Sequence, residues 1–109
     1  IIGTQRAMAA SMLAKPITAE QALEWGLVWQ LVDDDQLGSE IEAMKQTLAN
    51  GPTRSYAAIK NLIYSSGQMT LEEQMNLETE TQRELGYTED YQEGGAAFRE
   101  KRPAVFKGR

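Results

Sequence analysis

Two capping boxes constrain the fold most, because each fixes a helix start through local hydrogen bonds alone. In the segments TAEQ at residues 18–21 and TLEE at residues 70–73, the threonine oxygen can accept the backbone N–H three residues later. The Gln or Glu at that later position can reach back to the threonine N–H. Helices are therefore predicted to begin near residues 19 and 71. Gly26 suits the left-handed position that ends the first helix, and the second is predicted to run to about residue 85.

Apolar periodicity and breaker residues predict four further helices. One covers residues 4–14, and one follows the acidic triplet at residues 33–35. A third starts at Pro52, because the first position of a helix tolerates proline. Thr88 caps a last helix that runs to about residue 102. The two clearest apolar stripes are Leu37, Ile41, Met44 and Leu48, and Tyr56, Ile59, Leu62 and Ile63.

Residues 27–32, LVWQLV, are rich in branched and aromatic side chains and predict one short β-strand. The predicted fold class is therefore mainly α with a single strand. A lone strand is not stable without neighbours, so it would need a sheet from elsewhere. We accordingly expect the 109 residues, which open with Ile1-Ile2-Gly3 rather than Met, to be a portion of a longer protein.

The composition excludes several classes of chemistry. There is no cysteine and no histidine, which rules out disulfides, thiolate or imidazole metal ligands, and Ser-His or Cys-His pairs within this chain. The acidic triplet lacks the spacing of a calcium loop, so no metal site is predicted. No catalytic residue is predicted either, because the paired carboxylates lie on helices where solvent exposure explains them. No apolar run approaches the ~20 residues of a membrane span, and the net charge of −5 argues against nucleic-acid binding. The lack of cysteine fits a reducing, cytoplasmic setting.

Charge is distributed unevenly, and this asymmetry defines the candidate site. Residues 94–109 hold five of the eleven basic residues and one of the sixteen acids, whereas residues 1–98 carry a formal charge of −9. Phe98 and Lys101 share one face of the last helix, where the ring can stack on a flat group and the amine can meet a phosphate. The alternative is that Phe98 packs in a core while the basic residues favour the negative end of the helix dipole. Lys60 is a weaker candidate that a simple stripe-edge position also explains.

Three segments in order resemble the enoyl-CoA hydratase/isomerase (crotonase) family. They are PITAEQALEWGLV at residues 16–28, GPTRSYAAIKN at 51–61, and TEDYQEG with AFREKRP at 88–94 and 97–103. The segments WGLVW at residues 25–29 and FKGR at 106–109 are most similar to the ring-epoxide isomerases of phenylacetyl-CoA degradation. The resemblance spans nearly the whole chain.

The resemblance implies that the chain is the C-terminal helical region of a crotonase-like α/β fold. Residues 1–32 would end the spiral core, and residues 33–109 would form the region that makes trimers, or dimers of trimers, and covers acyl-CoA. Phe98 and Lys101 match family positions that contact the adenine and phosphate end of CoA, whereas Gln82 stands where the family has an aromatic residue. No cofactor beyond the CoA thioester substrate is implied.

The catalytic groups of the family have no counterpart here, so the intact protein would be a hydratase or an isomerase and the chain alone would be inactive. The two reactions, and the acyl group, stay open. The alternative reading is a self-sufficient helical module that binds a protein partner through the helix at 71–85 and the basic tail.

Overall fold

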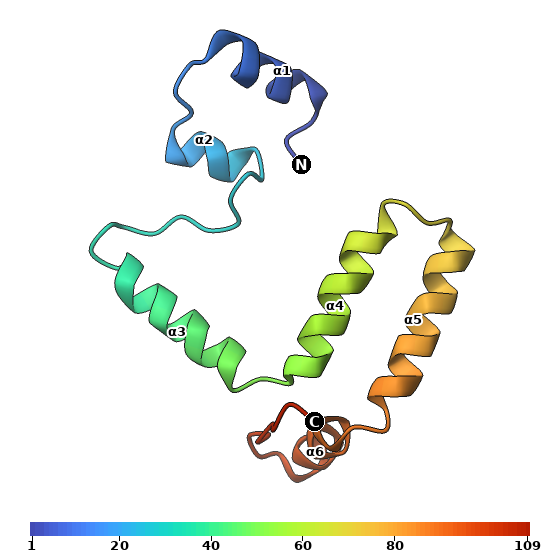
Figure 1. Cartoon of the computed structure of the whole chain (residues 1–109). Coiled ribbons are helices and arrows are strands. Elements are labelled where there is room, and N and C mark those ends of the chain that lie inside the picture. Colours follow the sequence, from blue (N-terminus) through green and yellow to red (C-terminus); the bar gives the residue numbers. More distant parts are fainter. The chain divides into compact units, whose positions relative to one another are not determined.

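A computed structural model describes all residues from 1 to 109 and contains six α-helices and no strand (Figure 1). The chain forms two compact units, Ile1–Glu40 and Ile41–Arg109. No helix combines the length and the apolar content that a membrane crossing requires. The helices are α1 (Thr4–Leu13), α2 (Ala19–Glu24), α3 (Leu37–Ala49), α4 (Thr53–Ser66), α5 (Leu71–Leu85) and α6 (Glu89–Glu100).

Both capping boxes form as predicted. The Gln21 N–H donates to Thr18 Oγ1 at 3.2 Å, and the Thr18 N–H donates back to Gln21 Oε1 at 3.1 Å. At the start of α5 the Glu73 N–H donates to Thr70 Oγ1 at 3.3 Å, and the Thr70 N–H donates to Glu73 Oε2 at 2.8 Å. The last hydrogen bond is charge-assisted and lowers the pKa of the Glu73 carboxyl. Local sequence therefore sets these two helix starts.

The predicted strand at residues 27–32 is wrong, and with it the predicted α/β character of the fold class. The backbone N–H groups of Leu27 and Val28 both donate to the Ala22 carbonyl, at 2.8 and 3.3 Å, which wraps the chain around the end of α2. Gly26 supports this turn with a φ of 71°. No second strand is present to pair with these residues, and branched side chains cannot hold an extended segment by propensity alone. The chain is all-α.

Helices α4 and α5 form an antiparallel hairpin within the second unit (Figure 1). Gln74 joins them, because its Nε2 donates to the Leu62 carbonyl at 3.3 Å and its Oε1 accepts from Ser65 Oγ at 3.4 Å. The face of α5 that is partly buried consists of Gln74, Leu77, Thr81 and Leu85. Leu71 and Met75, two apolar residues of the same helix, are 78% and 59% exposed.

Many large apolar side chains of the chain are exposed. Its accessible surface is 9095 Å², against the roughly 6,100 Å² of a compact folded chain of 12.2 kDa. Ala97 is the one buried hydrophobic residue, while Ile41, Ile59 and Ile63 are all more than half exposed. A self-sufficient helical module would bury these stripes in a core of its own. The exposed stripes instead mark surfaces that another polypeptide segment or subunit can cover.

Candidate functional site

The candidate site is built on α6, whose start is fixed by a buried threonine. Thr88 is only 5% exposed. Its Oγ1 accepts the Tyr91 N–H at 3.1 Å and donates to the Leu85 carbonyl at 2.6 Å. One hydroxyl thus caps α6 and adds a second hydrogen bond to the Leu85 carbonyl, which also accepts the Thr88 N–H at 2.9 Å, and together these contacts fix the corner between the two helices.

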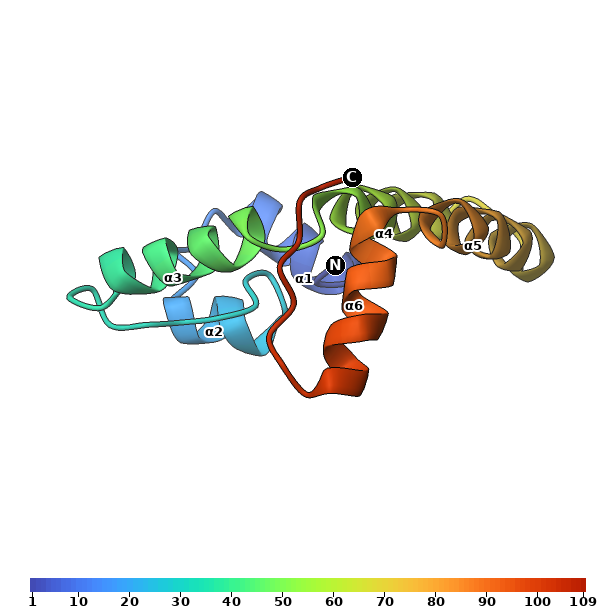
Figure 2. The ribbon, with the colours of Figure 1, turned by 90° about the horizontal axis from the view of Figure 1, so that it is seen from below.

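After α6 the chain reverses, and residues 103–109, here called the tail, run back along the helix (Figure 2). Asp90, which is 4% exposed, receives the end of the tail. Its Oδ1 accepts the Lys107 N–H at 2.7 Å and its Oδ2 accepts the Gly108 N–H at 2.9 Å. The Asp90 N–H in turn donates to the Arg109 carbonyl at 3.1 Å. A buried carboxylate whose two oxygens each bind a backbone N–H is a strong, directional anchor for the tail.

Glu93, one turn later, anchors the point of reversal. It binds Arg102 in a bidentate pair, with Nη1 at 2.6 Å and Nη2 at 2.9 Å from its two oxygens, and it also accepts the Val105 N–H at 2.8 Å. The Arg102 hydrogen bonds, followed by that of Val105, lower the pKa of the Glu93 carboxyl to about 2. The same pairing raises the pKa of the Arg102 guanidinium. Arg102 Nε also donates to Glu100 at 2.6 Å.

The end of α6 places Lys101 in an unusual backbone conformation. Its φ of 54° and ψ of 40° lie in the left-handed region, where glycine is usual after a helix. The Lys101 N–H donates to the Phe98 carbonyl at 3.3 Å, and the Arg102 N–H donates to the Ala97 carbonyl at 3.1 Å, which is the Schellman arrangement. A left-handed L-residue costs roughly 1–2 kcal/mol, so a lysine here is held against its own preference.

Phe98 lies one turn before Lys101 and is 86% exposed. The alternative that it packs in a core therefore does not describe this chain. Gly94 and Gly95 precede it in the helix, and a Cβ on either would make only an ordinary van der Waals contact, 3.7 Å from the Phe106 ring of the tail and 3.6 Å from the Arg99 guanidinium.

The basic residues of this region fall into two groups. Arg102 pairs with Glu93 and Glu100, and Lys107 and Arg109 pair with Glu89 at 3.8 and 3.3 Å. Lys101 and Arg99 have no carboxylate within ion-pair distance. The charge that the sequence concentrates at this end is therefore largely neutralised within the fold, and Lys101 keeps its charge available.

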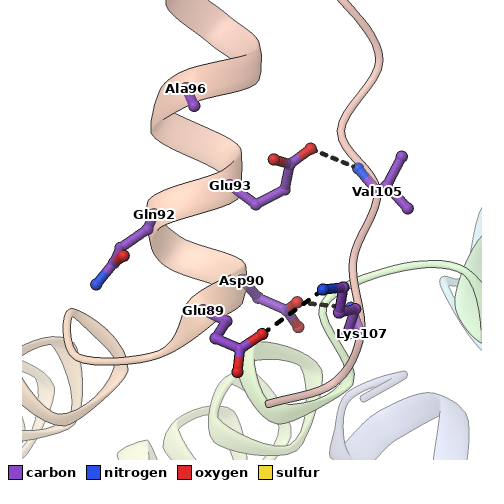
Figure 3. Close-up of a pocket in the computed structure, with 7 residues that line it drawn as sticks. All are labelled: Glu89, Asp90, Gln92, Glu93, Ala96, Val105 and Lys107. Atoms are coloured by element: carbon purple, nitrogen blue, oxygen red, sulfur yellow. Dashed lines mark hydrogen bonds and ion pairs between the residues drawn. The ribbon is translucent and has the colours of Figure 1, made fainter.

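A groove of about 330 Å³ lies between α6 and the tail. Figure 3 shows Glu89, Asp90 and Glu93 pointing across it to the tail. All three carboxylates are already used, on Lys107, on backbone N–H groups or on Arg102. The groove is consequently the seam between helix and tail, and it offers no spare charged group to a ligand.

The other candidates lie outside this region. Lys60 is exposed on α4, with its Nζ 5.9 Å from the Tyr64 ring centroid, which fits the stripe-edge interpretation. Gln82 is exposed on α5. Sequence reasoning missed Asp90 and Glu93, because acids in the first turns of a helix are already explained by the helix dipole. What these two acids bind is decided by hydrogen-bond partners 9 to 18 residues later in the chain.

Comparison with known proteins gives the family. A sequence model of the enoyl-CoA hydratase/isomerase family matches residues 1–109. This chain belongs to that family. Among curated family members, a 1,2-epoxyphenylacetyl-CoA isomerase of Escherichia coli is 40% identical over the whole chain, and a trans-2-decenoyl-[acyl-carrier-protein] isomerase of Streptococcus mutans is 34% identical over 99% of it.

Solved structures of family members share the backbone arrangement. An enoyl-CoA hydratase from Geobacillus kaustophilus matches 99% of the chain with 33% identity and a TM-score of 0.90. An enoyl-CoA hydratase from Bacillus anthracis matches 99% with 28% identity and a TM-score of 0.90. The chain spans about two fifths of these relatives: 42% of the E. coli isomerase and 41% of the G. kaustophilus hydratase. The matches do not support the predicted placement of the chain at the C-terminal end of such a protein.

Proposed function

We propose that the full-length protein converts an acyl-CoA thioester, by hydration or isomerisation, and that this chain contributes a contact to the CoA moiety through Phe98 and Lys101. The observation that carries the proposal is an 86% exposed Phe98 one turn before the unpaired, left-handed Lys101. Family membership over residues 1–109 supports the acyl-CoA chemistry.

The pair suits the nucleotide end of CoA chemically. An adenine ring can stack on an exposed phenyl ring, a contact worth about 1–3 kcal/mol for a nucleic-acid base. The phosphates carry the negative charge that an unpaired ammonium attracts, and a flexible lysine stem can follow them as a point charge. Lys101 is free for this contact because it is in no ion pair, and Glu100, the acid that precedes it in the chain, is bound to Arg102. No cofactor other than CoA is part of the proposal.

The test uses the full-length enzyme with Lys101→Ala, and Lys107→Ala as the matched control. Lys107 is the same residue type nearby, but it is paired with Glu89. Loss of a charged contact is expected to raise the KM for a CoA thioester about tenfold in the first variant and leave kcat unchanged. The KM for the corresponding pantetheine thioester, which lacks the nucleotide, should not change. An unaltered KM for the CoA thioester in Lys101→Ala would contradict the proposed contact.

For the acyl group we propose an aromatic ring-epoxide CoA thioester. The support is the 40% identity to the E. coli protein named 1,2-epoxyphenylacetyl-CoA isomerase. Full-length enzyme should convert 1,2-epoxyphenylacetyl-CoA with a higher kcat/KM than a straight-chain enoyl-CoA. The opposite order would refute the substrate assignment and leave the CoA contact untouched.

We also propose that the catalytic groups lie outside residues 1–109 and that the exposed stripes serve assembly into trimers or dimers of trimers. The support is the exposure of Ile41, Ile59 and Ile63 and the lack of a core that would cover them. The isolated 109 residues should show no turnover under conditions where the full-length enzyme is active. Sedimentation of the full-length protein should give three or six subunits, and a monomer would exclude the assembly role.

A further inference from the structure

The chain reversal around Lys101 is held by an unusual number of side-chain hydrogen bonds from one residue. Arg102, directly after it, makes four hydrogen bonds: two to Glu93, one to Glu100 and one to the Pro103 carbonyl. Glu100, directly before it, is one of those partners. Both sequence neighbours of Lys101 are thus tied to one guanidinium, while the Lys101 amine itself is unpaired.

We propose that Glu93 is a positioning residue for CoA binding: through Arg102 it holds the reversal that presents the Lys101 amine beside Phe98. This inference rests on the proposed function of Lys101. Glu93 itself touches no ligand in the proposal. It acts through Arg102, the residue that directly follows the left-handed Lys101 in the chain.

The geometry of the Glu93 carboxylate supports this role. It is the meeting point of three segments: α6, from which it extends, the reversal through Arg102, and the tail through the Val105 N–H at 2.8 Å. Its side chain is 23% exposed, so water competes less for it than for most surface acids. Its depressed pKa agrees with these contacts. A planar, bidentate pair fixes orientation as well as distance, which a lysine in place of Arg102 could not do.

The left-handed backbone explains why such a clamp is needed. Residue 101 is not glycine, so its conformation is disfavoured unless surrounding contacts determine it. The two Schellman hydrogen bonds supply part of the restraint, and the Arg102 pair supplies the rest. Without the pair, the residue can relax to an ordinary conformation, and its amine then no longer has a fixed direction.

The test is a double-mutant cycle in the full-length enzyme. Glu93→Gln is expected to raise the KM for a CoA thioester about three- to tenfold, with kcat and the KM for the pantetheine thioester unchanged. In the Lys101→Ala background, Glu93→Gln should have no further effect on KM, because its action passes through the missing amine. Glu89→Gln is the matched control: it removes an acid of the same helix that pairs with Lys107 and Arg109 instead. It should leave KM unchanged.

The outcomes separate the inference from the function on which it rests. If Lys101→Ala leaves KM unchanged, the CoA contact itself fails. If Lys101→Ala raises KM but Glu93→Gln does not, only the positioning role fails. If Glu93→Gln raises KM equally with and without Lys101, or raises it for the pantetheine thioester, then Glu93 acts by general stability and the inference is overturned. The exchanged pair Glu93→Arg with Arg102→Glu should recover a KM closer to that of the wild type than either single change.

Discussion

The carboxylate of Asp90 accepts the backbone N–H of Gly108, eighteen residues away, at 2.9 Å. With its other oxygen on the Lys107 N–H, it fixes the end of the tail against the first turn of α6. This contact joins a buried acid to backbone groups, so no surface charge can replace it. The two backbone N–H groups of Lys107 and Gly108 at the end of the tail therefore depend on one side chain.

Asp90→Asn should release the tail without unfolding α6. The amide can accept only through its oxygen, so one of the two tail N–H groups would face an NH₂ group. A hydrogen bond to a charged group contributes about 1.5–3 kcal/mol, so its loss corresponds to roughly 10- to 150-fold faster hydrogen exchange. Mass-spectrometric exchange at the amides of Lys107 and Gly108 measures this. Glu89→Gln, whose acid is exposed, should change these rates little, and equal effects would contradict the special role of Asp90.

Lys101→Gly should stabilise the protein while weakening CoA binding. Glycine adopts the left-handed conformation without the steric cost, and after allowance for its greater freedom in the unfolded chain the gain is about 0.5–1 kcal/mol. The midpoint of urea unfolding should therefore rise as the KM for a CoA thioester rises. Lys101→Ala removes the same charge without relieving the backbone, so it should raise KM only. A glycine variant no more stable than the alanine variant would show that residue 101 is not strained.

Acid should loosen the reversal between pH 4.5 and about 2. The pKa of Glu93 falls from 4.5 to about 2 on folding, so its pairing stabilises the fold fully above pH 4.5 and is lost as the pH falls through the folded value. Hydrogen exchange at the Val105 amide, corrected for the intrinsic rate, should accelerate over this range. In Glu93→Gln the exchange should already be fast at neutral pH and independent of this titration. A titration centred near 4.5 in the wild type would refute the tight pair.

Ile63→Lys should disrupt assembly of the full-length protein. Ile63 is 67% exposed on α4, and a buried charge at a subunit contact is costly unless it finds a partner. Sedimentation should show smaller species, whereas Asn76→Lys on the exposed side of α5 should keep the native mass. If Ile63→Lys retains the native mass but melts at a lower temperature, Ile63 packs within one subunit and the assembly surface lies elsewhere.

The sequence predicts best where a contact closes within one helical turn. Thr18 and Thr70 mark the starts of α2 and α5 because their partners lie three residues away. The strand at residues 27–32 failed because a strand depends on a neighbour that the composition of the segment cannot supply. The packed face of α5 likewise depends on a neighbouring helix: Gln74 and Thr81 are polar, yet they are partly buried, and α4 supplies the Leu62 carbonyl to Gln74.

In the candidate site too, the residues that the sequence could predict differ from those that it could not by how far away their partners lie. Phe98 and Lys101 could be selected from helical spacing, and family membership supports the chemistry assigned to them. The acids that hold the reversal could not, because Glu93 meets Arg102 nine residues later and Asp90 meets the tail seventeen and eighteen residues later. Pairings at these separations follow from the path of the chain after α6. That path depends on the left-handed backbone of residue 101, which a lysine at this position does not predict.

The hydrogen bond from the Asp90 N–H to the Arg109 carbonyl makes α6 and the tail a closed ring without a covalent bond. A helix usually loses order from its ends, one turn at a time. Here the first turn cannot open unless residues 107–109 leave, and they cannot leave while Asp90 keeps its helical position. Residues 88–109 should consequently open in a single cooperative step, and a mechanical load on Arg109 would be transmitted directly to the beginning of the helix rather than to its end.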